Sequence, residues 1–205
     1  MNRRSCLLSG FLLTLGASPA FAQCTLQVEP NHSTVAFSVP IAGGITRVTG
    51  KFTAFKLEIN FDEKNLTRSS VSASIQADSI QTGIEARDAD LRGEQFFAVK
   101  DYPEITFESR EIKKRGRQYV AIGPLNMRGM TKTVELPFVI TAVQWDEKKR
   151  PVLGISVRYE LNRLDFGVGA GWRHTSIPNF IGNSVTIEIH FWTRPGKAKA
   201  NSGAL

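Results

Sequence analysis

The sequence predicts an all-β protein, an eight-stranded antiparallel barrel with one short helix, and three observations lead to this class. Apolar and polar residues alternate in segment after segment, turn residues separate these segments, and one stretch breaks the rhythm with helical spacing. In residues 55–62 (FKLEINFD) every odd position is apolar and every even position is polar. Such a strand has one dry and one wet face. A sheet of these strands can bury its dry faces by stacking into a sandwich or by closing on itself.

Eight segments fit this reading. The alternation is clearest in residues 134–138, 155–161 and 185–191, and turn residues such as DEKN at 62–65 separate one segment from the next. The strands are expected at 33–40, 46–61, 69–77, 104–112, 118–125, 132–144, 152–162 and 184–193. The longest interruption, residues 83–97, places apolar residues among charges at helix-compatible spacing, which predicts the short helix there.

The first 22 residues have the pattern of a secretory signal peptide. Two arginines precede the apolar run 7–15, and the small-x-small sequence AFA follows at 20–22, so we expect cleavage near Ala22. The run is too short to span a bilayer, and no later stretch approaches the roughly 20 apolar residues that a spanning helix needs. A soluble, exported, periplasmic protein is expected, with the barrel at 23–194 and a disordered tail at 195–205.

Charge and cysteine content suggest no strong polyanion partner. The full chain has a formal net charge of +7, and two of these charges leave with the signal peptide. The basic clusters 113–115 and 148–150 lie between strand patterns, which favours wet hairpin turns over a nucleic-acid site, while transient attraction to anionic membranes stays open. Cys24 is the single cysteine left after cleavage, so no internal disulfide can form, and an inert thiol is favoured over lipid attachment. Monomer and homodimer both stay open.

Eight strands are the number at which a closed barrel is either filled by its own side chains or holds one small ligand. Bulky rings on the dry faces would crowd the interior, whereas Ala73, Ala77 and Ala121 would leave room, so alternation alone leaves both outcomes open. The candidate lining residues are Phe37, Phe52, Phe61, Ile75, Phe107, Leu125, Met127, Phe138, Tyr159, Phe166 and Phe191.

Many short motifs, in order along the chain, resemble the YceI-like family. They are NHS at 31–33, FSV at 37–39, VTGKF at 48–52, FD at 61–62, TG at 82–83, RDADL at 87–91, FF at 96–97, YPEITF at 102–107, GPLNMRGMTK at 123–132, RLDFG at 163–167 and GNSV at 182–185. The resemblance implies a lipocalin-like barrel whose apolar tunnel binds a polyisoprenoid or another long-chain, fatty-acid-like lipid. It therefore favours the ligand-binding barrel over the filled one.

The chain departs from the family pattern at the helix. Relatives usually carry histidine at the position of Asp90, and a ligand head group that touches this histidine would face an anion here, which disfavours phosphate. Arg87, in the same motif, is a candidate to grip a ligand head group with Asp88 fixing its fork. The alternative, which we favour, is that this pair ties the helix to the barrel rim, because adjacent helical residues do not share a face.

Catalysis has little support in the sequence. His32, His174 and His190 fall at separate places with no zinc-ligand spacing, and no Gly-x-Ser-x-Gly motif is present, so we expect neither an enzyme nor a metal or cofactor. Two other functions stay open. An eight-stranded outer-membrane barrel would need an apolar outer face, which the charged wet positions oppose. A periplasmic interaction module without a ligand has no specific signature in the sequence.

Overall fold

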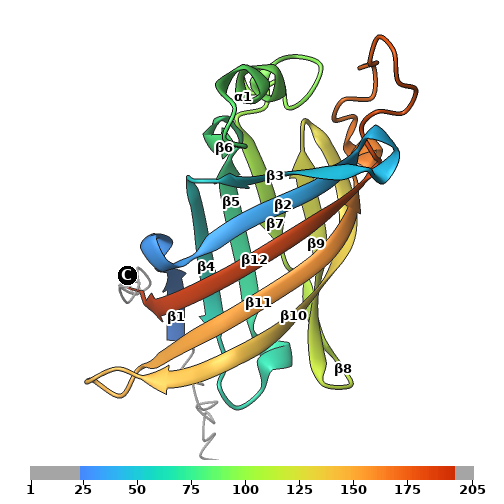
Figure 1. The fold of residues 1–205 in the computed structure, drawn as a ribbon. Coiled ribbons are helices and arrows are strands. Elements are labelled where there is room, and N and C mark those ends of the chain that lie inside the picture. The colour runs from blue at the N-terminus through green and yellow to red at the C-terminus, as the bar shows by residue number, and fades with distance from the viewer. Residues whose placement is uncertain (1–23, 197–205) are drawn as a thin grey trace, which may run out of the picture.

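The computed structural model describes residues 24–196, and almost all of its regular structure is β-strand (Figure 1). The strands are β1 (Cys24–Val28), β2 (Thr34–Ile41), β3 (Thr46–Phe52), β4 (Phe55–Phe61), β5 (Ser70–Gln76), β6 (Ile80–Gln81), β7 (Glu104–Glu108), β8 (Glu111–Arg115), β9 (Gln118–Met127), β10 (Met130–Trp145), β11 (Pro151–Asn162) and β12 (Ser184–Pro195). The helical segments are α1 (Glu85–Arg92) and the 3₁₀ turns η1 (Pro30–His32), η2 (Ala42–Gly44), η3 (Leu66–Arg68), η4 (Ala77–Ser79) and η5 (Arg163–Phe166).

Eight strands form a closed antiparallel ring in the order β1-β4-β5-β7-β9-β10-β11-β12, and β12 pairs with β1 to complete it. Each of the other four strands is next to a ring strand along the chain and extends it: β2 follows β1, β3 precedes β4, β6 follows β5 and β8 follows β7. These four strands therefore lengthen the wall. The predicted fold class, an eight-stranded antiparallel barrel with one α-helix, is confirmed. Strand β1 was not predicted, and the predicted strand 46–61 is two strands that meet at a corner.

The predicted strand 104–112 is also interrupted, at the junction of β7 and β8. The Ser109 backbone N–H donates to the Val71 oxygen, and the Ser109 hydroxyl accepts from the Val71 N–H, both at 2.9 Å. Gly123 on β9 lies so close to the junction that a Cβ there would overlap the backbone oxygen of Glu108. Among the described strands β8 therefore pairs with β9 alone and leaves the path of β7.

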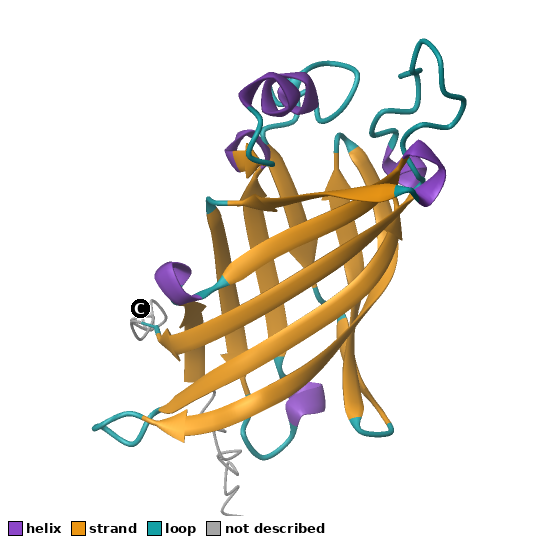
Figure 2. Ribbon diagram, in the orientation of Figure 1, coloured by secondary structure: helices purple, strands orange, loops and turns teal. Residues whose placement is uncertain are grey.

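The two ends of the barrel are built differently, and Figure 2 shows α1 beyond one end of the strand wall. We call this the helix end; it comprises α1 with the segment 93–103, and the connection 163–183 that leads to β12. At the opposite end lie the η3 connection 62–69, the β8–β9 turn and the β10–β11 turn 146–150, which we call the hairpin end (Figure 1).

Arginines hold the helix end together, Arg87 and Arg163 among them. Arg87 donates to the side-chain and backbone oxygens of Thr82, at 2.7 and 2.9 Å, and the buried Asp88 accepts from the Thr82 N–H and hydroxyl, at 2.8 and 2.5 Å. Arg163 donates to backbone oxygens on both stems of the connection 163–183, from Val168 at 2.7 Å to Gly182 at 2.9 Å. Burial lowers the pKa of Arg163, yet its guanidinium remains the hub of this connection.

Part of the sequence lies outside the described residues. The expected signal peptide, residues 1–22, and the expected tail beyond Gly196 both fall there. Pro195, which was expected to begin the tail, is instead the last residue of β12 and lies opposite Leu26 of β1. Between residues 24 and 196 the structure has no helix with the length and apolar character that crossing a bilayer requires.

Candidate functional site

The barrel encloses a cavity with an almost wholly apolar wall. Of the 31 residues that line it, only Lys56, Ser69 and Tyr159 carry a polar side-chain group. The space open to the centre of a water-sized sphere is about 180 Å³. A single water needs about 10–15 Å³ of volume occupied by the whole sphere, and the volume occupied here exceeds the space open to the sphere centre, so the barrel is hollow and its own rings do not fill it.

The dimensions of the cavity suit a hydrocarbon chain. Lining residues on β11 run from Leu153 to Leu161 at every second position. Eight residue steps of about 3.3 Å, at a strand tilt of about 40°, give a height of about 20 Å. Spread evenly over this height, 180 Å³ leaves a wall about 3 Å from the axis once the sphere radius of about 1.4 Å is added. A carbon contact radius of about 1.9 Å fits inside.

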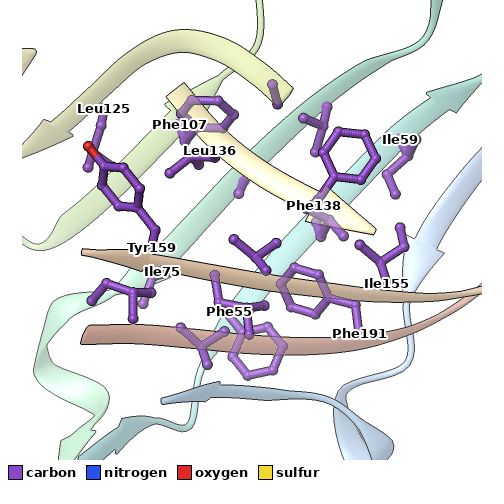
Figure 3. Close-up of a pocket in the computed structure, with 18 of the residues that line it drawn as sticks. Phe55, Ile59, Ile75, Phe107, Leu125, Leu136, Phe138, Ile155, Tyr159 and Phe191 are labelled. Carbon is purple, nitrogen blue, oxygen red and sulfur yellow. The ribbon is translucent and has the colours of Figure 1, made fainter. Parts of the chain in front are cut away.

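Small residues between the rings keep this space open. Ala73 on β5 lies opposite Leu57 on one side and Phe107 on the other, so two large side chains flank a small one across three strands. On β3, Gly50 lets the ring of Phe37 lie against the wall, because a Cβ at Gly50 would overlap that ring. Figure 3 shows the rings of Phe107, Phe138 and Phe191 reaching into the space from separate strands.

The hydroxyl of Tyr159 is the hydrogen-bonding group that this wall offers to a ligand. Ser69 already accepts the backbone N–H of Asp62 at 2.9 Å, and Lys56 is exposed on a wet strand position. The Tyr159 hydroxyl has no hydrogen-bond partner among the described residues, and its oxygen is the single polar atom on the side chains labelled in Figure 3. Desolvation, and after it the Asp165 carboxylate, raises the pKa of Tyr159, so the hydroxyl stays neutral.

Ten of the twelve predicted site residues line the cavity. These are Phe37, Phe52, Phe61, Ile75, Phe107, Leu125, Met127, Phe138, Tyr159 and Phe191. Phe166 does not line it, because η5 carries this ring into the packed cluster at the helix end, where it is 2% exposed. Arg87 does not reach the cavity either, since its guanidinium is held by Thr82. That these ten side chains contact a ligand stays a prediction.

Prediction from the sequence missed several lining residues that the strand parity could have supplied. Leu57 and Ile59 alternate with Lys56 and Glu58 on β4, so the apolar pair faces inward. The same alternation identifies inward positions on the neighbouring strands. The missed residues with a clear parity signal are Phe55, Leu57, Ile59, Leu136, Ile140, Leu153, Ile155, Ile187 and Ile189. Aromatic residues were favoured over aliphatic ones, although both sets share the inner face.

The two ends of the cavity differ in how they are covered. At the helix end Phe97, Val99 and Trp172 pack on the buried cluster that contains Phe96 and Phe166, and none of these residues lines the cavity. The ring centroids of Phe96 and Trp172 lie 6.2 Å apart, so the cover is an aromatic layer. At the hairpin end the cavity extends to Leu66 of η3.

Other candidate groups lie outside the cavity. Asp90, which replaces the family histidine, is exposed on α1 and is not a lining residue. Cys24 is a free cysteine on β1, and burial raises the pKa of its thiol, which keeps it protonated and unreactive. Across residues 24–196, no three histidine, cysteine, aspartate or glutamate side chains gather so as to hold a metal ion.

Comparisons with known sequences agree with this architecture. The model of the YceI-like domain family matches residues 26–192. A UPF0312 protein of Photorhabdus laumondii is 31% identical over 154 residues, which cover 75% of this chain and 78% of that protein. A UPF0312 protein of Yersinia pestis is 34% identical over 132 residues, covering 64% and 68%.

Solved structures share the fold. BcnA of Burkholderia cenocepacia superposes with a TM-score of 0.69 at 24% identity, covering 80% of this chain and 98% of that one. A polyisoprenoid binding domain from Saccharophagus degradans gives a TM-score of 0.63 at 14% identity, covering 84% and 99%. These likenesses concern the fold, while the family match extends over nearly all of the described residues, and the chain therefore belongs to the YceI-like family.

Proposed function

We propose that this protein binds one long-chain apolar lipid, a polyisoprenoid or a fatty-acid-like molecule, in the barrel cavity and sequesters or carries it in the periplasm. The observation that carries the proposal is the cavity itself, a void about 20 Å tall with 28 apolar lining residues out of 31. A filled barrel would have no such void. The polyisoprenoid binding domain from Saccharophagus degradans, which has the same fold, supports this class of ligand.

The binding energy can come from burial alone. Each methylene taken out of water contributes about 0.8 kcal/mol, so a dozen contribute about 10 kcal/mol before the entropy of association is subtracted. Affinity in the micromolar range or tighter is therefore reachable without a polar contact. The Tyr159 hydroxyl adds one hydrogen bond for a ligand that carries an oxygen within the chain or at its end.

The role we propose is binding and not catalysis. Among the residues that line the cavity, Tyr159 and Lys56 are the two that carry a titratable side chain, and Lys56 is exposed on a wet strand position, so the cavity wall holds no acid–base pair. The periplasmic location rests on the signal-peptide pattern in residues 1–22.

An integral outer-membrane barrel is disfavoured by the outer face of the wall. Arg158 and Glu188 form an ion pair across β11 and β12, and Arg115 pairs with Glu135 at 2.7 Å across the outer face of β8 to β10. Charged side chains on a lipid-facing wall would cost about 2–4 kcal/mol each near the bilayer centre. An interaction module without a ligand would leave the void unexplained.

Mass spectrometry of small molecules that co-purify with the protein tests the proposal, and a parity-matched pair of variants sharpens it. Phe138 lines the cavity, whereas Val139, the next residue on β10, points outward and pairs with Ser156. Phe138→Asp places a carboxylate in the apolar void and should abolish lipid binding. Val139→Asp should keep about one lipid per barrel.

Far-UV circular dichroism of both variants separates lost binding from lost folding. Repeated preparations of the unaltered protein that contain no lipid and also refuse added fatty acid or polyprenol would overturn the proposed function. Equal loss of binding in the two folded variants would show that the cavity is not the site.

A further inference from the structure

An apolar strip leads from the cavity to the surface at the hairpin end. In the register of β10 and β11, Val143 lies opposite Leu153 and Trp145 lies opposite Pro151. Paired residues share a face of the sheet, so Val143 and Trp145 continue the inner face to which the lining residue Leu153 belongs. Leu153 is 1% exposed, whereas Val143 is 47% exposed and Trp145 is 50% exposed. The inner wall of the barrel therefore emerges into solvent here.

The positive charge of the protein is concentrated at the same end. The segments 111–117 and 146–150 together hold seven basic and three acidic residues, a formal net charge of +4. Residues 24–196 as a whole hold 22 basic and 19 acidic residues, a net charge of +3. At the helix end, segment 78–104 and the connection 163–183 together hold five basic and eight acidic residues, a formal net charge of −3. The barrel is thus polarised along its length.

Hydrogen bonds and an ion pair fix the backbone conformation of the β10–β11 turn, which carries Lys148 and Lys149. The Asp146 carboxylate accepts the backbone N–H groups of Lys148 and Arg150, at 2.9 and 2.8 Å, and forms an ion pair with the Arg150 guanidinium at 2.7 Å. These contacts, the Arg150 N–H foremost, lower the pKa of Asp146 and keep it ionised. Asp146 and Arg150 neutralise each other, while exposed Lys148 and Lys149 have no ion-pair partner among the described residues.

We propose that the hairpin end docks on a bilayer that contains anionic phospholipid, and that lipid passes between the bilayer and the cavity there. The exchange step rests on the proposed function. Tryptophan favours the interface between headgroups and hydrocarbon, and lysines near an anionic surface are attracted to it. Docking would place Trp145 and Val143 in this interface with Lys148 and Lys149 among the headgroups. A lipid could then move along the apolar strip without crossing water.

The helix end is the rival docking face. It also exposes apolar side chains: Ile177 is 40% exposed, and Ile45 on the β2–β3 turn, which bonds to the connection 163–183, is 87% exposed. However, the acidic segment 78–104 would be repelled by an anionic surface, and the aromatic layer around Phe96 separates this end from the cavity. Charge and access to the cavity therefore both favour the hairpin end.

Flotation of the purified protein with two kinds of vesicle tests the docking surface. One kind is phosphatidylcholine alone, and the other contains equal parts of phosphatidylcholine and phosphatidylglycerol. The unaltered protein should float with the anionic vesicles and lose this binding at high salt. Lys148→Gln combined with Lys149→Gln should weaken the binding about 25-fold, at about fivefold for each charge removed. Lys100→Gln combined with Lys132→Gln, two exposed lysines towards the helix end, is the matched charge control and should change little.

Tryptophan emission reports where the protein touches the bilayer. Trp145 is one of three tryptophans, so a variant with Trp172→Phe and Trp192→Phe reports on it alone. Its emission should shift to shorter wavelength when anionic vesicles are added. Trp145→Ser should weaken vesicle binding, whereas Ile45→Ser at the opposite end should not. An unshifted emission, or a loss of binding that follows Ile45→Ser instead, would overturn the docking surface.

Loading with a fluorescent fatty acid in vesicle-free buffer keeps the two hypotheses apart. Variants of the hairpin end should load normally in this assay and yet acquire lipid more slowly from anionic vesicles. A protein that loads but ignores both kinds of vesicle, or that binds only an acidic protein, would overturn the docking surface and leave the proposed function standing. A protein that binds anionic vesicles but cannot be loaded would overturn the proposed function and the exchange step, and leave docking itself supported.

Discussion

Ligand affinity should rise steeply with chain length and then level off once the chain fills the cavity. Each buried methylene contributes about 0.8 kcal/mol, so each one added should lower Kd about fourfold. The height of about 20 Å, taken from the five lining residues between Leu153 and Leu161 on β11, accepts about sixteen carbons. From twelve to sixteen carbons Kd should therefore fall about 200-fold, and from sixteen to twenty carbons by less than about tenfold. Displacement of a fluorescent fatty acid in vesicle-free buffer measures the series.

A matched pair of variants tests whether the cavity sets this limit. Ala73 lines the void between Leu57 and Phe107. Ala73→Phe should shorten the part of the cavity that a ligand can fill, so the affinity should level off at a shorter chain length. Ser72→Phe adds the same ring on the neighbouring exposed position and should leave the plateau in place. An affinity that does not depend on chain length, or that keeps rising beyond sixteen carbons at the same slope, would contradict a cavity that holds about sixteen carbons. A plateau that moves equally in both variants would do so too.

Two further predictions concern stability. Leu153→Ala removes a side chain that is 1% exposed and should lower the free energy of unfolding by about 2–5 kcal/mol, measured by urea denaturation. Arg163→Gln removes the guanidinium that bonds to Val168 and Gly182 and should lower the free energy of unfolding by about 2–3 kcal/mol. The chain length at which ligand affinity levels off should not change, because Arg163 does not line the cavity. Arg163→Lys should not restore the stability, since an ammonium cannot reproduce the planar fork; full rescue by lysine would contradict this role.

Strand parity explains why the lining residues could be found without a structure. A strand in a closed barrel has one inner face, so the position of Phe138 or Phe191 in its alternating run fixes the direction of its ring. The rule fails where the chain leaves the strand. Phe166 lies on η5, and the turn aims its ring into the cluster at the helix end. Arg87 is on a helix, where the nearest acceptor, Thr82, decides its direction.

Breaks within strands were harder to predict, because they depend on partners distant in sequence. Ser109 ends β7 by bonding to Val71, and Gly123 makes the close approach possible, yet neither contact is visible in the run 104–112. Strand β1 was missed for a local reason and not because of distant partners. Its five residues alternate correctly, but they follow the expected cleavage site directly, where a short run is easily assigned to the leader.

Whether a barrel is hollow depends on register, which is why alternation alone could not decide it. Three alanines were candidates to leave room, and the structure treats them differently. Ala73 lies opposite Phe107, and Ala121 lies opposite Leu136, so each small residue offsets a large neighbour within the lining. Ala77 is 1% exposed in the packed cluster at the helix end and adds nothing to the void. A shift of one residue in the β5–β7 register would turn Ala73 outward relative to Phe107 and close the gap. The void is therefore a property of the pairing, and the ligand length that it accepts should respond to substitutions at Ala73 and Ala121 but not at Ala77.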